Sequence, residues 1–222
     1  DPAPALAVVK TVVGPNGPFA TPEFVNSEVG ARLLRYLAEA DAAATLTCIE
    51  RTYAQRSHAE LLAWRAGRQD IVWALEKIAV WEPCFERAVR VLAKMAVAEN
   101  ANNSNNSKGT LRDLFWIGLG WAPTQAPPAR RFPILKEFLT SRDESLRELG
   151  LELAESWLST RGGSHMVGAE NQGLRPTLEF WRPKTYGEVY DPWRQVWALL
   201  ETELAGAEGR WRERIAETLI NA

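Results

Sequence analysis

Apolar residues recur every three or four positions along most of this 222-residue chain, which is the spacing of a helix with one buried face. We expect the apolar stripes to face the core. In the first half they comprise Val29, Leu33, Tyr36 and Leu37, then Leu46, Ile49 and Tyr53, then Leu61 to Ile78, then Phe85 to Met95. No stretch alternates as a half-buried strand does. The pattern predicts an all-α protein of about ten helices.

Polar residues predict where several helices start. Ser57 with Glu60, and Ser141 with Glu144, have the spacing of a capping box. Asp191 followed by proline has the form of a cap and first helical residue. Gly67 predicts a break between helices.

Prolines give further boundaries. Pro83 is expected to open one helix, and Pro127 and Pro128 to open another. Pro133 fits that second helix only if it lies in the first turn, because proline lacks an N–H and clashes inside a helix.

Two segments interrupt the periodicity. The stretch from Ala98 to Thr110 is rich in asparagine and serine, and we interpret it as an ordered turn between helices, with Thr110 capping the next helix and Gly109 at positive φ. The stretch from Arg161 to Tyr190 is rich in glycine and proline yet carries aromatic residues. It predicts a long ordered loop packed on the body near 161–190.

Short turns between helices of similar length favour antiparallel pairs. The helix spacing is compatible with an α-solenoid of HEAT-like pairs, although no repeat is visible in the letters, and an irregular helical bundle is the alternative. We expect a single domain over 1–222, with a possible division into helical repeats at 1–160 and a loop plus two helices at 161–222.

The formal net charge of −2 provides no field that would attract nucleic acid or an anionic membrane, so we expect neither as a partner. Cys48 and Cys84 lie in or beside apolar helical patterns. They predict buried thiols and a cytoplasmic protein. No apolar run is long enough for a membrane helix, and Ala5 to Val13 fits a signal peptide poorly. The chain starts at Asp1, and we expect it to be a piece of a longer protein.

Candidate chemistry is sparse. We find no phosphate-binding glycine loop and no histidine pair with metal spacing, so we expect no catalytic, cofactor or metal site. An enzyme with His165, Glu170 and Arg175 in the 161–190 loop is the alternative. The basic clusters Arg87, Arg90, Lys94 and Arg130, Arg131, Lys136 are interleaved with acids, and solvated helix faces explain them best.

Most of the ten tryptophans lie within helical stripes, including Trp64, Trp157, Trp193 and Trp197, and we expect them in the core. Trp181 lies outside any stripe and is a candidate surface anchor.

Several strings resemble a helical region of large bacterial multidomain proteins, the STAND-type regulatory NTPases and related defence proteins. The similar stretch runs from Arg56 to Leu200, and Ser107 and Lys108 depart mildly from its usual letters. The strings are Arg68 to Lys77, Ala98 to Asn100 followed by Asn105 to Thr110, and Met166 to Glu170 followed by Gly173 to Arg175. The resemblance implies a scaffold or sensor module. This chain carries no NTPase motif, so the resemblance assigns it no hydrolysis.

The sequence therefore predicts a non-enzymatic helical-repeat scaffold or sensor that contacts other domains of its own chain or a protein partner. A purely structural spacer is a further alternative, in which alanine at Trp181 and Arg175 would change nothing. The candidate contact residues are Asn105, Asn106, Arg175, Trp181 and Lys184.

Overall fold

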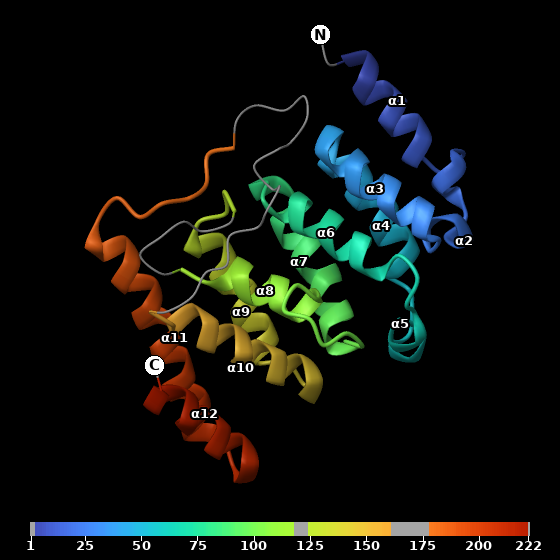
Figure 1. The fold of residues 1–222 in the computed structure, drawn as a ribbon. Coiled ribbons are helices and arrows are strands. Elements are labelled where there is room, and N and C mark those ends of the chain that lie inside the picture. Colours follow the sequence, from blue (N-terminus) through green and yellow to red (C-terminus); the bar gives the residue numbers. More distant parts are fainter. Residues whose placement is uncertain (1–2, 118–123, 161–177, 222) are drawn as a thin grey trace. The chain divides into compact units, whose positions relative to one another are not determined.

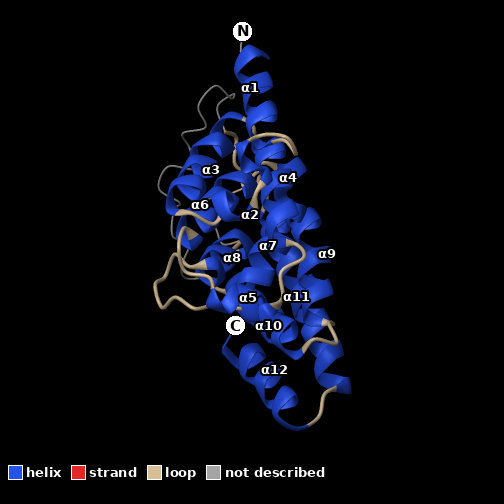
Figure 2. Ribbon diagram, turned by 90° about the vertical axis from the view of Figure 1, so that its right-hand side faces the viewer, coloured by secondary structure: helices blue, strands red, loops and turns tan. Residues whose placement is uncertain are grey.

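A computed structural model describes residues 3–117, 124–160 and 178–221. Within these ranges the chain forms twelve α-helices, one short 3₁₀ helix and no strand, which confirms the all-α prediction (Figure 2). The elements are α1 Ala3–Val13, η1 Pro18–Ala20, α2 Pro22–Val25, α3 Glu28–Ala40, α4 Ala42–Tyr53, α5 His58–Ala63, α6 Arg68–Ala79, α7 Glu82–Val97, α8 Ser107–Phe115, α9 Pro128–Leu139, α10 Glu144–Leu158, α11 Tyr186–Gly206 and α12 Gly209–Asn221.

The chain divides into two compact units, and the boundary falls inside α8 between Thr110 and Leu111. Of the described residues, the first unit takes those up to 110 together with 178–179, and the second takes 111–117, 124–160 and 180–221. This boundary differs in place from the division considered at residue 160.

The first unit is built around α3, α4, α6 and α7. Helix α6 packs against α3 and α7, and α4 touches all three (Figure 1). Apolar residues from each helix are fully buried, among them Leu34, Leu46, Ile71 and Leu92. Cys48 and Cys84 are buried and are not joined in a disulfide, as expected.

The second unit packs α9 against α10, and α11 against α9, α10 and α12. Its largest buried side chain is Trp157, whose ring meets those of Phe115 and Phe132 at centroid distances of 6.3 and 6.4 Å. The indole N–H of Trp157 donates to the carbonyl of Pro192, 3.2 Å away. This bond ties α10 to α11 within the unit.

Our prediction of which face of α3 is buried was wrong. Val29, Leu33 and Tyr36 are exposed, and the helix buries Gly30, Ala31, Leu34 and Ala38 instead. Helix α3 packs against α6, and tertiary packing buries the face of α3 that is poorer in large side chains.

Several helix ends follow the sequence. Ser57 and Glu60 form the capping box, with the Ser57 hydroxyl accepting from the Glu60 N–H and the Glu60 carboxylate accepting from the Ser57 N–H. Gly67 adopts a φ of +69° between α5 and α6. Pro83 lies in the first turn of α7, and Pro127 caps α9 ahead of Pro128.

Three helix signals were wrong in detail. The cap of α10 is Asp143, whose carboxylate accepts from the N–H groups of Ser145 and Leu146, and Ser141 does not cap it. Pro133 lies in the second turn of α9. Pro192 lies inside α11, so Asp191 and Pro192 do not start a helix.

Helix α11 begins at Tyr186, where Thr185 caps it by accepting from the Glu188 N–H at 3.2 Å. The predicted loop therefore ends before residue 186, and the part at 161–177 lies outside the described residues. A threonine cap followed by one acidic residue, Glu188, in the first turn outweighed the proline that comes later.

Candidate functional site

The asparagine-rich turn is closed by one carboxylate, that of Glu99, which follows α7. Its Oε1 accepts from the backbone N–H groups of Asn100 and Ala101, at 2.9 and 3.1 Å. Its Oε2 accepts from the Ser107 backbone N–H at 2.9 Å and from the Ser107 hydroxyl. One side chain thus joins the first residues of the turn to the first residue of α8.

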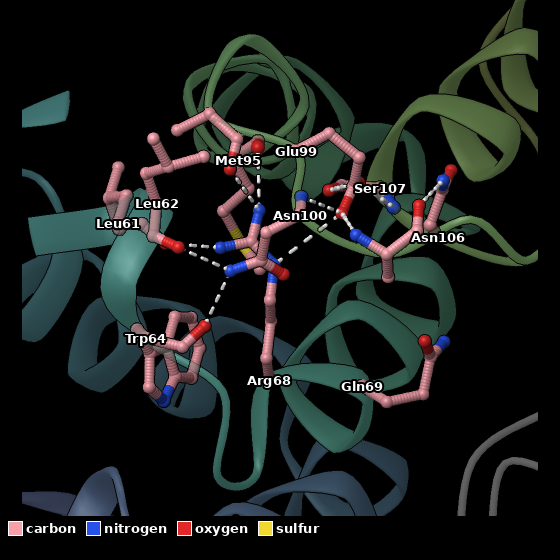
Figure 3. A network of polar contacts seen from close by, with 12 residues as sticks. Leu61, Leu62, Trp64, Arg68, Gln69, Met95, Glu99, Asn100, Asn106 and Ser107 are labelled. Atoms are coloured by element: carbon pink, nitrogen blue, oxygen red, sulfur yellow. Dashed lines mark hydrogen bonds and ion pairs between the residues drawn. The ribbon is translucent and has the colours of Figure 1, made fainter. Parts of the chain in front are cut away.

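The guanidinium of Arg68 lies beneath this turn and is almost fully buried (Figure 3). It donates to the carbonyls of Leu61, Met95 and Ala98 at 2.6, 2.7 and 3.0 Å. Its Nε lies 3.7 Å from Oε1 of Glu99, which is an ion pair rather than a hydrogen bond. Burial lowers the pKa of Arg68, and the Glu99 charge opposes that shift.

Asn100 and Gln69 attach the turn to neighbouring helices. The Asn100 amide donates to the carbonyls of Leu62 and Trp64, at 2.7 and 2.8 Å, and so holds the end of α5 (Figure 3). The Gln69 amide donates to the carbonyl of Asn105 at 2.7 Å. The prediction of an ordered turn is confirmed by these bonds.

The capping of α8 differs from our prediction. The helix begins at Ser107, and the side-chain Oδ1 of Asn106 accepts from the Gly109 N–H at 2.9 Å, which is the capping role expected of Thr110. Thr110 lies buried within the helix. Gly109 is helical and does not have positive φ. A glycine is needed there because a Cβ would lie 1.8 Å from the carbonyl oxygen of Ser104.

Two of the predicted contact residues, Asn105 and Asn106, lie in this turn. Asn106 is half-buried and its side-chain amide donates to the carbonyl of Ala101, so its hydrogen bonds serve the turn. Asn105 is exposed; its backbone carbonyl accepts from Gln69, and its side-chain Oδ1 accepts from the Ser104 hydroxyl at 3.3 Å. Asn102, Asn103 and Ser104 are exposed along with Asn105, so this stretch of the turn faces solvent.

Trp181 is half-buried in the second unit. Its backbone N–H donates to the carbonyl of Thr124 at 2.9 Å, and its ring lies 5.5 Å from the guanidinium carbon of Arg131. Arg131 is fully buried and donates to the carbonyls of Leu114 and Trp116, and burial lowers its pKa to about 9. The Trp181 ring therefore has an internal partner through a cation–π contact.

Lys184 is exposed just before α11, and its backbone N–H donates to the Glu188 carboxylate at 2.6 Å. Arg175, and the alternative catalytic residues His165 and Glu170, lie outside the described residues. Of the predicted contact residues, Trp181 and Lys184 precede α11, which begins at Tyr186.

A row of aromatic side chains follows on α11, spaced four, three and four residues apart. We call Tyr186, Tyr190, Trp193 and Trp197 the aromatic row. The rings of Tyr186 and Tyr190 stack at 6.2 Å, and Trp193 meets Tyr190 edge-on at 5.7 Å. Tyr186, Tyr190 and Trp197 are exposed by 76%, 43% and 38%.

The aromatic row was not predicted, because we expected a helix to start at Asp191, between Tyr190 and Trp193. With α11 running through that point, the four aromatic residues fall on one helix face. Trp197, which we expected in the core, is exposed there, and its indole N–H donates to the Glu201 carboxylate at 3.1 Å. The helical spacing of these four aromatic residues is visible in the sequence, but Pro192 led us to expect a helix start in the middle of them.

Neither known protein families nor curated proteins nor solved structures show a match to this chain. In the part of the chain that the structure describes, no three acidic, histidine or cysteine side chains gather as metal ligands would. No described helix has both the length and the apolar character needed to cross a bilayer.

Proposed function

We propose that this chain is a non-enzymatic helical scaffold or sensor module that makes protein contacts through the aromatic row of α11. The exposure of three large aromatic side chains on one helix face is the observation that carries this proposal. Tyrosine and tryptophan supply a large share of binding energy at protein interfaces, and contiguous exposed apolar surface marks such sites.

The charge around the aromatic row indicates the chemistry of the partner. Between Lys184 and Leu204 the sequence carries four carboxylates, Glu188, Asp191, Glu201 and Glu203, and two cations, Lys184 and Arg194. Cations also bind over tyrosine and tryptophan rings. The occupant is a protein segment that presents lysine or arginine beside apolar side chains, either from a partner or from elsewhere in its own chain.

The kind of protein to which this module belongs is proposed from its sequence. The resemblance of the strings from Arg68 to Lys77 and around Asn105 supports a place in a bacterial regulatory protein of the STAND-type NTPase kind, with helical pairs stacked as a HEAT-like solenoid. The two buried cysteines, which form no disulfide, support a reducing compartment such as the cytoplasm.

Site-specific photo-crosslinking tests the proposal. A benzoylphenylalanine replaces Tyr190 in the native host, and a matched probe replaces Tyr36, another exposed tyrosine, on α3. The Tyr190 probe is expected to link a discrete segment rich in lysine or arginine that the Tyr36 probe does not link.

A synthetic peptide of the linked segment is then titrated against the purified chain. Tyr186→Ala is expected to weaken its binding at least tenfold, since an aromatic hot spot contributes about 2 kcal/mol. Tyr36→Ala serves as the control and should bind normally. Identical adducts at both positions, or an unchanged Kd in Tyr186→Ala, would contradict the proposal and favour a structural spacer.

A further inference from the structure

The turn between α1 and η1 packs directly against the last turn of α1. A Cβ on Gly17 would lie 2.2 Å from the carbonyl oxygen of Val12 and 2.4 Å from that of Thr11, so only glycine permits this approach. The N–H of Gly17 also donates to the carbonyl of Gly14 at 3.2 Å, which closes the turn. The packing of this turn therefore requires a glycine directly after Asn16.

One guanidinium from α4 holds both ends of this turn. Arg51 donates through Nη2 to the carbonyl of Val13, the last residue of α1, at 3.1 Å and to that of Phe19 in η1 at 3.0 Å. Phe19 is buried, and its ring meets that of Phe24 edge-on at 5.0 Å. The chain between Val13 and Phe19 therefore runs between two fixed points.

Asn16 is the chemically reactive residue of this turn. Its side chain is exposed, and no described residue bonds to its amide. Asparagine is a labile residue because the next backbone nitrogen can attack its side-chain amide, and glycine has no side chain to shield that nitrogen. The bond of the Gly17 nitrogen to Gly14 is at the long end of the range for N–H donors. The glycine that the packing requires thus leaves Asn16 open to attack.

We propose that Asn16 is a site of spontaneous deamidation and isoaspartate formation, a covalent modification that releases α1. The Gly17 nitrogen loses its proton to hydroxide and attacks Cγ of Asn16. The N–Cγ bond forms, the Cγ–Nδ2 bond breaks, and ammonia leaves with a proton from water. A second water then opens the cyclic imide at either of its carbonyl carbons, which gives aspartate or isoaspartate. Water is the only reagent.

Isoaspartate lengthens the backbone, because the main chain then runs through the side-chain carbon, which adds one bond of about 1.5 Å. Arg51 holds both ends of the turn and Gly17 lies against α1, so the turn cannot take up the added length. Helix α1 buries only Val9 and Val13, whereas α4 belongs to the core. The element that detaches is therefore α1, in a local opening that leaves the rest of the unit folded.

Two Asn–Ser pairs in the asparagine-rich turn are internal controls. Both atoms of the Asn106 side-chain amide are hydrogen-bonded, and the N–H of Ser107 donates to the Glu99 carboxylate at 2.9 Å. Neither the amide nor the nitrogen that would attack it is free to move. Asn103 is exposed but precedes Ser104, whose side chain shields the nitrogen. We expect Asn103 to react slowly and Asn106 to stay intact.

Incubation of the purified chain at physiological temperature and at several pH values tests the site. Peptide mapping by mass spectrometry follows each asparagine, and isotopically labelled water marks the carboxyl group that forms when the imide opens. Asn16 is expected to convert at least about tenfold faster than Asn103, because glycine leaves the attacking nitrogen unshielded. The rate should rise with pH, since the nitrogen must lose its proton. Isoelectric focusing should show a net charge one unit more negative than −2.

Two variants separate the added backbone length from the added charge. Asn16→Gln keeps the amide but has to close a larger ring, so conversion at this position is expected to stop. Asn16→Asp, used freshly purified, carries the new charge without the longer backbone. Hydrogen exchange is then compared between the aged parent protein and both variants. Amides of α1 are expected to exchange faster in the aged parent, whereas both variants keep the rates of the fresh parent.

Three outcomes would overturn the proposal. Conversion of Asn16 no faster than that of Asn103 would refute the site. Unchanged exchange of α1 in the aged parent, or equally fast exchange in fresh Asn16→Asp, would refute the release of α1 by a lengthened backbone. Asn16 is exposed, so both variants leave the core unchanged. None of these measurements involves the aromatic row of α11, and failure here is therefore separate from failure of the proposed function.

Discussion

At the scale of single residues, Glu99 and Arg68 have the largest structural role in the first unit. Glu99 accepts four hydrogen bonds from both ends of the turn, and Arg68 joins α5 to the end of α7 through three carbonyls. Both groups are shielded from solvent, with side-chain exposures of 13% for Glu99 and 5% for Arg68. Their charges are therefore poorly screened and depend on each other.

Glu99→Gln is expected to lower the free energy of unfolding by about 3 kcal/mol, because it leaves a buried guanidinium without its counter-charge. Urea denaturation measures this change. Glu86→Gln is the control, since Glu86 pairs with Arg90 at the surface and its loss should change stability by less than about 1 kcal/mol. Equal losses in both variants would show that Glu99 acts only as a surface charge.

At the scale of elements, the turn before α8 depends on close backbone approach. The carbonyl of Ser104 occupies the position that a Cβ on Gly109 would take. An alanine usually stabilises a helix by up to about 1 kcal/mol relative to glycine, but here it must move backbone rather than a flexible side chain. The steric term outweighs the helix propensity.

Gly109→Ala is therefore expected to destabilise the protein by about 1 to 3 kcal/mol. The matched control is Gly206→Ala at the end of α11, where a Cβ would meet nothing within 4 Å. That variant should leave stability unchanged or raise it by up to about 1 kcal/mol. Thermal denaturation of the two variants gives the comparison, and a stable Gly109→Ala protein would refute the close-approach argument.

At the scale of the whole molecule, the chain forms two compact units divided within α8. Each has its own buried apolar core, which includes Leu46 and Ile71 in the first and Trp157 and Leu200 in the second. Separate cores allow separate opening, because the free energy of local unfolding is set by the contacts within each cooperative region.

Hydrogen exchange on the Glu99→Gln variant tests this division. Amides of α4, α6 and α7 are expected to exchange faster than in the parent protein, whereas those of α9, α10 and α11 keep their rates. Mass spectrometry of peptic peptides resolves the two sets. Uniform acceleration across both sets would mean that the chain unfolds as one cooperative unit.

The sequence by itself determined the helical class, the capping box at Ser57, the break at Gly67 and the burial of both cysteines. These depend on local hydrogen bonds, on backbone geometry or on strong apolar preference, which are properties of a few neighbouring residues. The order of the asparagine-rich turn was also predicted, although its caps were assigned to the wrong residues.

Only the tertiary structure decided which face of α3 is buried and that α11 continues through Pro192. Each depends on residues distant in sequence, because α3 packs against α6 and the indole N–H of Trp157 donates to the carbonyl of Pro192. Packing over such separations overrides local propensity, and no short-range pattern records it.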